Sequence, residues 1–314
     1  MTPLRAEGEL VLAIDVGGTA IKAMVAGTDG TAVVETSRPT PTGDGAAALV
    51  VVLEVARELL RSGLPVTRVG LAVPGIVDPA RGLVVYSANL GWRKAPVAAT
   101  VADGLRLPVA LVHDVTAAGV AEHRLGAGRG VNDLLMVAIG TGIAAAIIAG
   151  GRPLLGGAGQ AGELGHVVVR TGGRLCGCGR CGCLEAEASA SAIARTYAER
   201  AGRSVAGAAD VAALLGSDPV ADAVWQNAVQ ALADGLLDAI ALLGSSRIVV
   251  GGGLSKAGHR LLLPLATAMR ERASVHTMPE LVLAALGARG GLVGAALMAA
   301  EAHRLHAPGS GARR

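Results

Sequence analysis

The chain has 314 residues, enough for two domains of ordinary size, and 52% of its residues are apolar. Its formal net charge is only +3 and its arginines are scattered, so the composition argues against a nucleic-acid partner. Aromatic residues make up 1% of the chain and Phe is absent, which also argues against a single-stranded nucleic-acid site built on stacked rings.

Two stretches bear on membrane contact. Asp15 and Lys22 interrupt the first apolar stretch, so no signal peptide is predicted and a cytoplasmic location is expected. Residues 134–151 carry no charge and have about the length of a membrane-spanning helix, but Thr141 and several glycines lie in the middle. A strand, a tight turn and a second strand explain this stretch better, and no membrane contact is expected.

The first part of the chain predicts an antiparallel meander. An apolar strand over residues 10–16 ends in the turn Gly17-Gly18-Thr19, and a second strand follows over 20–26. Asp29-Gly30 is typical of a type I′ hairpin turn, and a third strand is predicted over 31–36. The next predicted elements are a helix through residues 49–60, strands at 69–73 and 109–112, and a helix over 116–125.

A second strand, turn and strand at 134–149 repeats the first. The segments Ile14 to Thr19 and Val137 to Gly142 align without a gap, which predicts a duplicated hairpin with one copy in each domain. The remaining predicted elements are helices at 186–201, 220–243 and 257–270, a buried strand at 247–250, and a disordered tail from residue 307.

The glycine turns after buried strands predict a phosphate-binding site. Such turns point backbone N–H groups into one small space, which suits phosphate oxygens, although ordinary hairpin turns are the alternative. Asp15 precedes the first turn, and Mg²⁺ beside nucleotide phosphates is a suitable partner for a carboxylate that is costly to bury alone. The candidate nucleotide-binding residues are Asp15, Gly17, Gly18, Thr19, Gly140, Thr141 and Gly142, with Gly252 and Gly253 suited to contact adenosine.

Asp114 lies where a predicted strand meets a predicted helix. Its carboxylate could accept the proton of an attacking hydroxyl group while magnesium and the glycine turns stabilise a transferring phosphoryl group. The alternative is an N-cap for the helix that follows.

The strongest local signal combines Glu163-Leu164-Gly165-His166 with four cysteines between residues 176 and 183. The cysteines are too close together for a disulfide framework, whereas Zn²⁺ takes four nitrogen or sulfur ligands in a tetrahedron. His166 with three cysteines predicts a structural zinc site, and an all-cysteine site or an unmetallated thiol cluster is the alternative. Glu163 and Glu185 bracket the site as acceptors for sugar hydroxyls, and His166 could add its second ring nitrogen, unless the carboxylates only pair with arginines.

In this order the motifs resemble the ROK family of bacterial sugar kinases, especially its zinc-containing glucokinases. The resemblance covers about residues 10–300. It implies the α/β fold of two-domain actin-like ATPases (ribonuclease H-like), with duplicated β-meanders, phosphate-binding hairpins and an active site in the cleft between the domains. It also implies a small domain of residues 1–115 plus about 298–314 and a large domain of residues 116–297. The motifs that carry it lie at residues 15–19, 72–78, 89–92, 139–142, 163–166, 176–185 and 250–254.

The resemblance further implies that ATP phosphorylates the 6-hydroxyl of a hexose, with glucose as the first candidate. The alternative substrates are N-acetylglucosamine, N-acetylmannosamine, fructose and allose, and the alternative phosphate donor is polyphosphate. A non-catalytic sugar sensor is the alternative function. The resemblance also implies a homodimer or homotetramer. His113 stands where the family commonly has Asn. The implied base is Asp114, the sugar contacts are Gly75, Asn89, His113, Asp114, Glu163, His166 and Glu185, and the zinc ligands are His166, Cys176, Cys178 and Cys183, with Cys181 as a spare thiol.

Overall fold

A computed structural model describes residues 9–41, 43–157, 159–275 and 277–306. The chain divides into two compact units. The first comprises the described residues within Met1–Ala121, Leu155–Gln160 and Arg289–Arg314, and the second comprises those within Glu122–Leu154 and Ala161–Ala288. The domain boundaries expected near residues 115 and 298 stay a prediction, and the tail expected to be disordered lies outside the described residues.

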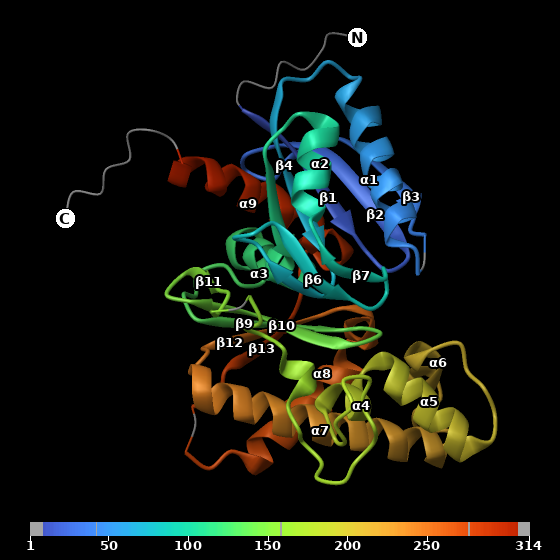
Figure 1. Ribbon diagram of the computed structural model, residues 1–314. Helices are drawn as coiled ribbons and strands as arrows, with labels where there is room; N and C mark the ends of the chain where they lie inside the picture. Colours follow the sequence, from blue (N-terminus) through green and yellow to red (C-terminus); the bar gives the residue numbers. More distant parts are fainter. Residues whose placement is uncertain (1–8, 42, 158, 276, 307–314) are drawn as a thin grey trace, which may run out of the picture. The chain divides into compact units, whose positions relative to one another are not determined.

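The sheet of the first unit has the strand order β3-β2-β1-β4-β8 (Figure 1). The first three strands form the predicted antiparallel meander, and β4 and β8 extend it in parallel. A separate antiparallel sheet, β5-β6-β7, was not predicted. The strands are β1 (Leu10–Val16), β2 (Ala20–Gly27), β3 (Ala32–Pro39), β4 (Val66–Val73), β5 (Ile76–Asp78), β6 (Leu83–Ser87), β7 (Trp92–Ala95) and β8 (Val109–His113).

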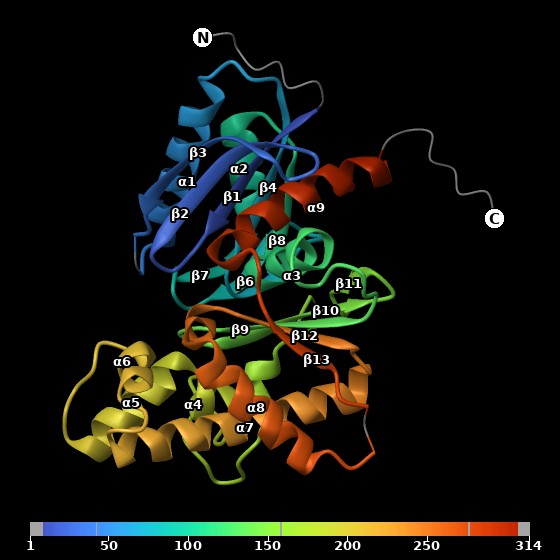
Figure 2. The ribbon, with the colours of Figure 1, turned by 180° about the vertical axis from the view of Figure 1, so that it is seen from behind.

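Helices cover both faces of the five-stranded sheet. α1 (Gly45–Leu60) and α2 (Val97–Leu105) lie on one face, and α9 (Gly290–His306) lies on the other (Figures 1 and 2). Side chains alternate along a strand, so Leu12 and Ile14 join the apolar cluster beneath α1 while Asp15 points to the face of α9. A Cβ atom at Gly291 would lie only 2.9 Å from Asp15 Oδ2. The glycine therefore leaves room for the carboxylate.

Further glycines let α9 approach its neighbours closely. A Cβ atom at Gly70 on β4 would collide with the carbonyl of Ala295, and one at Gly294 would collide with the carbonyl of Ala117. Ala117 belongs to α3 (Asp114–Leu125), so α9 packs against both the sheet and the helix that carries Asp114. The glycine-rich start of α9 fits this packing, because any side chain there would push the backbones apart.

The sheet of the second unit, β11-β10-β9-β12-β13, repeats the first with the same pattern of antiparallel and parallel neighbours. The predicted duplication is therefore confirmed. The uncharged stretch at 134–151 forms β9 and β10, and no helix in the described part of the chain is long and apolar enough to span a membrane. The strands are β9 (Leu134–Ile139), β10 (Ile143–Ala149), β11 (Arg152–Leu154), β12 (Arg247–Gly251) and β13 (Glu280–Leu283).

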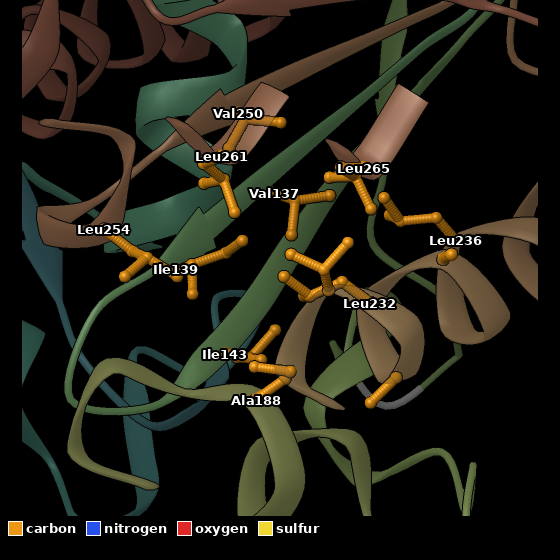
Figure 3. Close-up of a cluster of buried hydrophobic side chains, with 14 of the residues drawn as sticks. Val137, Ile139, Ile143, Ala188, Leu232, Leu236, Val250, Leu254, Leu261 and Leu265 are labelled. Carbon is orange, nitrogen blue, oxygen red and sulfur yellow. The ribbon is translucent and has the colours of Figure 1, made fainter. Parts of the chain in front are cut away.

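One face of this second sheet is buried under helices. Val137 and Ile139 of β9 meet leucines from two long helices in a continuous apolar cluster (Figure 3). The helix predicted over 186–201 is wrong in one respect, since Ser189 adopts an extended conformation and its hydroxyl oxygen caps a new helix by accepting from Ala192 N. The helices are α4 (Leu184–Ala188), α5 (Ala190–Ala201), α6 (Ala208–Ala213), α7 (Pro219–Leu243) and α8 (His259–Arg272).

Asp218 starts the longest helix, α7, and joins it to α5. Its carboxylate caps the helix by accepting from the Val220 and Ala221 amides, and Pro219 occupies the first helical position. The same carboxylate accepts the hydroxyl proton of Tyr197 at 2.6 Å and pairs with Arg203 at 2.8 Å. These bonds lower the pKa of Asp218 to about 2, with the Tyr197 bond as the largest cause.

Candidate active site

The first glycine turn is held by backbone bonds and by one threonine. Gly17 N donates to Ala20 O at 3.0 Å, and the hydroxyl of Thr40 donates to Gly17 O at 2.7 Å. Thr40 N also donates to Thr19 O at 3.0 Å. Gly18 and Thr19 remain exposed, and a Cβ atom at Gly18 would meet nothing within 4 Å. The turn is thus fixed at its base and open at its tip, and no local sequence signal singles out Thr40.

Asp15 occupies the end of β1 with its carboxylate half-buried. Burial, then the negative charge of Asp114, raises its pKa to about 6, while Lys22 acts in the opposite direction. A carboxyl group that resists ionisation in this way is stabilised as an anion when a cation arrives. Asp15 therefore fits the predicted role beside a magnesium nucleotide, because a cation there would replace the solvent that burial removes.

Asp114 is the first residue of α3, and its side chain is 28% exposed. Its Oδ1 accepts a hydrogen bond from Val115 N at 2.7 Å, so the carboxylate does serve a helix amide, as the capping alternative supposed. Burial raises its pKa, whereas the neighbouring His113 lowers it. Asp114 keeps an oxygen for other partners and has the raised pKa that suits a general base.

Two further predicted sugar contacts belong to the first unit. Gly75, two residues after the end of β4, has φ +104°, and a Cβ atom there would collide with the carbonyl of Tyr86. Only glycine fits this position without strain. Asn89 is exposed, and its backbone carbonyl accepts from Gly43 N at 3.2 Å, which leaves its side-chain amide available.

The second glycine turn is clamped from the start of α5. Gly140 N donates to Gly142 O at 2.9 Å, and Ala190 N donates to Gly140 O at 2.8 Å. The hydroxyl of Ser191 donates to the carbonyl of Thr141. Thr141 is exposed at the tip. Sequence reasoning missed Ser191, since it lies 50 residues from its partner.

Glu185 links this turn to the cysteine-rich segment, residues 166–183, which it follows in the chain. Its Oε2 accepts from Ile143 N, the first amide after the turn, at 2.9 Å. A Cβ atom at Gly142 would collide with the same oxygen, so the glycine is required for the approach. One carboxylate oxygen thus positions the backbone, and the other is left for a ligand.

The third glycine run follows β12. Gly252 has φ +80°, and a Cβ atom there would lie 2.6 Å from Ile139 N. The hydroxyl of Ser255 donates to Gly252 O at 2.7 Å. A Cβ atom at Gly253 would meet nothing within 4 Å, so one glycine packs on β9 while the next presents open backbone.

The predicted zinc ligands converge in the second unit. One ligand atom from each of His166, Cys176, Cys178 and Cys183 lies within 4.8 Å of the others. Cys176 Sγ is 3.6 Å from His166 Nδ1, and the Sγ atoms of Cys178 and Cys183 are 3.7 Å apart. The edges of a tetrahedron with zinc–ligand bonds of about 2.0–2.3 Å are about 3.3–3.8 Å long, so both separations fit such an ion.

The second ring nitrogen of His166 faces a carboxylate. Nε2 lies 3.9 Å from Glu163 Oε2, and both side chains are more than one third exposed. Cys181 is exposed and does not belong to the four-residue cluster. The arrangement agrees with a division in which Nδ1 faces a metal and Nε2 faces a substrate hydroxyl.

Ion pairs anchor the cysteine-rich segment to the helices around it. Arg170 bonds to Asp234 on α7, and Arg174 bonds to Glu199 on α5 at 2.6 Å. Arg174 N also donates to Glu187 on α4 at 2.7 Å. These contacts join the segment to three helices, α7, α5 and α4.

The predicted site residues therefore form two groups. Asp15, the first turn, Gly75, Asn89, His113 and Asp114 belong to the first unit, and the second turn, the third glycine run and the cysteine-rich segment belong to the second.

Comparison with known proteins decides the family. The model of the ROK family matches residues 11–302. The chain belongs to the ROK family. It is 33% identical over 307 residues to a glucokinase of Halalkalibacterium halodurans, covering 90% of this chain and 92% of that protein.

Solved ROK structures share the fold. The structure matches a ROK hexokinase of Thermus thermophilus with a TM-score of 0.85 and 33% identity, covering 94% of this chain and 99% of that one. It matches a ROK family glucokinase of Streptomyces griseus, solved with glucose and AMPPNP, with a TM-score of 0.82 and 31% identity over 93% and 99% of the two chains. The predicted fold class is confirmed.

Proposed function

We propose that this ROK protein is an ATP-dependent hexokinase that phosphorylates the 6-hydroxyl of glucose. The observation that carries the proposal is the Asp114 carboxylate, which is half-buried and whose pKa is raised by burial. Its negative charge acts on Asp15, which precedes the first glycine turn. A base with a raised pKa can take a hydroxyl proton near neutral pH. Family membership supplies independent support.

The chemistry divides between the units. In the first, Asp114 accepts the proton of the hydroxyl as its oxygen attacks the terminal phosphorus of ATP, and the bond to the leaving ADP oxygen breaks. In the second, the backbone around Gly140–Gly142 supplies N–H donors to phosphate oxygens as negative charge develops. Mg²⁺ near Asp15 would neutralise phosphate charge when bound.

The remaining predicted contacts select the sugar. The carboxylate of Glu163 and the free oxygen of Glu185 would accept hydrogen bonds from sugar hydroxyl groups, and Nε2 of His166 would donate or accept one. Asn89 and the Gly75 backbone, in the first unit, would add further contacts. Zn²⁺ held by His166, Cys176, Cys178 and Cys183 would fix the cysteine-rich segment, with no position open for substrate. The Streptomyces griseus glucokinase, solved with glucose, supports glucose as the first sugar to test. We also expect a cytoplasmic homodimer or homotetramer.

The test is ADP release from Mg-ATP across glucose, mannose, fructose, allose, N-acetylglucosamine and N-acetylmannosamine. Where polyphosphate replaces ATP as donor, formation of the sugar phosphate is measured instead. Glucose should give the highest kcat/KM. Faster turnover of another sugar would reassign the substrate but keep the reaction. No turnover with any sugar in folded, zinc-loaded protein would contradict kinase activity and favour a sugar sensor.

A further inference from the structure

His113 contacts the candidate base directly. It is the last residue of β8, and Asp114 begins α3 immediately after it. His113 Nε2 lies 3.3 Å from Asp114 Oδ1, and the two side chains are 17% and 28% exposed. The ring is therefore largely enclosed and faces the carboxylate with one nitrogen.

The contact distinguishes the two oxygens of Asp114. Oδ1 already accepts from Val115 N at 2.7 Å, and His113 Nε2 approaches the same atom. Both neighbours therefore lie at Oδ1, one donating a hydrogen bond and the other at 3.3 Å. Oδ2 is the oxygen left for a substrate proton.

We propose that His113 is a positioning residue for the base: its ring and the Val115 amide hold Asp114 through Oδ1, so that Oδ2 receives the proton of the sugar hydroxyl. The inference rests on the proposed function and deepens it. It gives His113 a different role from the direct sugar contact that the resemblance implied. The proton balance is simple, since the hydroxyl O–H bond breaks and an O–H bond forms at Oδ2.

The charges around Asp114 show how the His113 ring affects the pKa of the base. Asp15 at the end of β1 adds negative charge near Asp114, and Lys22 on β2 partly offsets Asp15. The facing α9 contributes Gly291 there, which has no charge. Burial favours a protonated Asp114 and His113 opposes this effect, so removal of the ring should raise the pKa of Asp114.

The experiment compares the parent with His113→Leu, His113→Gln and the control His259→Gln, an exposed histidine at the start of α8. Titration of Asp114 is followed by NMR of its carboxyl carbon, assigned with Asp114→Asn, and needs no activity. We expect His113→Leu to move this titration, and the acidic limb of kcat/KM, upward by roughly one pH unit.

Kinetics separate positioning from sugar binding. His113→Leu should lower kcat by about tenfold to a hundredfold, with the KM for sugar little changed. His113→Gln, which keeps a polar side chain of similar reach, should retain more of kcat, and His259→Gln should match the parent. Circular dichroism confirms that each variant is folded.

Two results would overturn the inference. An Asp114 titration that stays in place in both His113 variants would show that the ring does not act on the carboxylate, whatever the enzyme's activity. A raised sugar KM with unchanged kcat would make His113 a sugar ligand instead. Neither result would contradict kinase activity, which the sugar panel tests separately.

Discussion

Glu185 Oε2 accepts a hydrogen bond from Ile143 N at 2.9 Å, and this bond links the cysteine-rich segment to the second glycine turn. Glu185 comes two residues after Cys183, and Ile143 follows Gly142 directly. A predicted sugar ligand thus also supports a predicted phosphate-binding turn. The bond makes the two parts of the second unit's site dependent on one carboxylate.

Glu185→Asp should weaken the binding of both nucleotide and sugar. The shorter side chain cannot reach Ile143 N and a sugar hydroxyl together, and loss of a hydrogen bond to a charged group costs about 1.5–3 kcal/mol, or roughly tenfold or more in affinity. Ser191→Ala is the matched variant, since it removes the bonds of Ser191 to Thr141 and to Ser189 but leaves Glu185 in place. It should weaken nucleotide binding and leave sugar binding unchanged. Titration calorimetry with each ligand measures both effects. Unchanged nucleotide affinity in Glu185→Asp would contradict the link.

Asp15→Asn should stabilise the free protein while impairing nucleotide binding. The folded-state pKa of Asp15 is raised from 3.8 to about 6, so ionisation costs stability as the pH rises through this range. Replacement by neutral Asn should raise the free energy of unfolding at pH 7 by on the order of 1–2 kcal/mol. At pH 4 the gain should shrink, because the parent Asp15 is then protonated.

Denaturant unfolding at the two pH values measures this gain, and Mg-ATP titration measures the loss of affinity. Asp238→Asn is the control, since Asp238 is exposed on α7. If Asp15→Asn destabilised the protein at pH 7, the carboxylate would be satisfied within the protein and would need no cation.

Metal removal should loosen the cysteine-rich segment. Burial, then the hydrogen bond shared with Cys178, raises the pKa of the Cys183 thiol to about 12, so metal binding must displace protons and should weaken as the pH falls. We expect about one zinc ion per chain by mass spectrometry of the purified protein. Cys178→Ser should lose the ion and lower the Tm.

Cys181→Ser is the matched control and should keep the zinc ion and the Tm of the parent, because Cys181 is outside the ligand cluster. Loss of zinc in Cys181→Ser, with retention in Cys178→Ser, would show that the ligands are assigned wrongly.

Asp218 should make the second unit sensitive to acid. Its folded-state pKa is lowered from 3.8 to about 2, so its stabilising effect is present above pH 3.8 and is lost as the pH falls through about 2. Asp218→Ala should therefore lower the Tm at pH 7, and the difference from the parent should narrow below pH 3. Tyr197→Phe removes one of the bonds and should have a smaller effect. A Tm difference that does not change with pH would exclude the carboxylate charge as its cause.

Regular patterns in the sequence were sufficient for the first meander and for the first two strands of the second, whereas β11 was not predicted. Alternating or continuous apolar residues before Gly17 and Gly140 predicted the strands, and their alignment predicted the duplication that both sheets confirm. The ligand cluster could also be predicted, because its cysteines are close in sequence. Short spacing makes such a site a local property.

Other elements lacked a local signal. The strands β5 and β13 are three and four residues long, and α9 begins with two glycines, so neither periodicity nor helix propensity marks them. The bonds of Ser191 to Thr141 and of Glu185 to Ile143 join residues 50 and 42 positions apart. Such contacts follow from packing in three dimensions and need a structure to be found.

The most direct test of the central claim is a single-turnover reaction of Mg-ATP with glucose, followed by ³¹P NMR, for the parent and Asp114→Asn. The account predicts a sugar 6-phosphate signal that appears with ADP in the parent and at least about a hundredfold more slowly in the variant. ADP with inorganic phosphate in place of the sugar phosphate would contradict sugar phosphorylation, and equal rates in the two proteins would contradict Asp114 as the base.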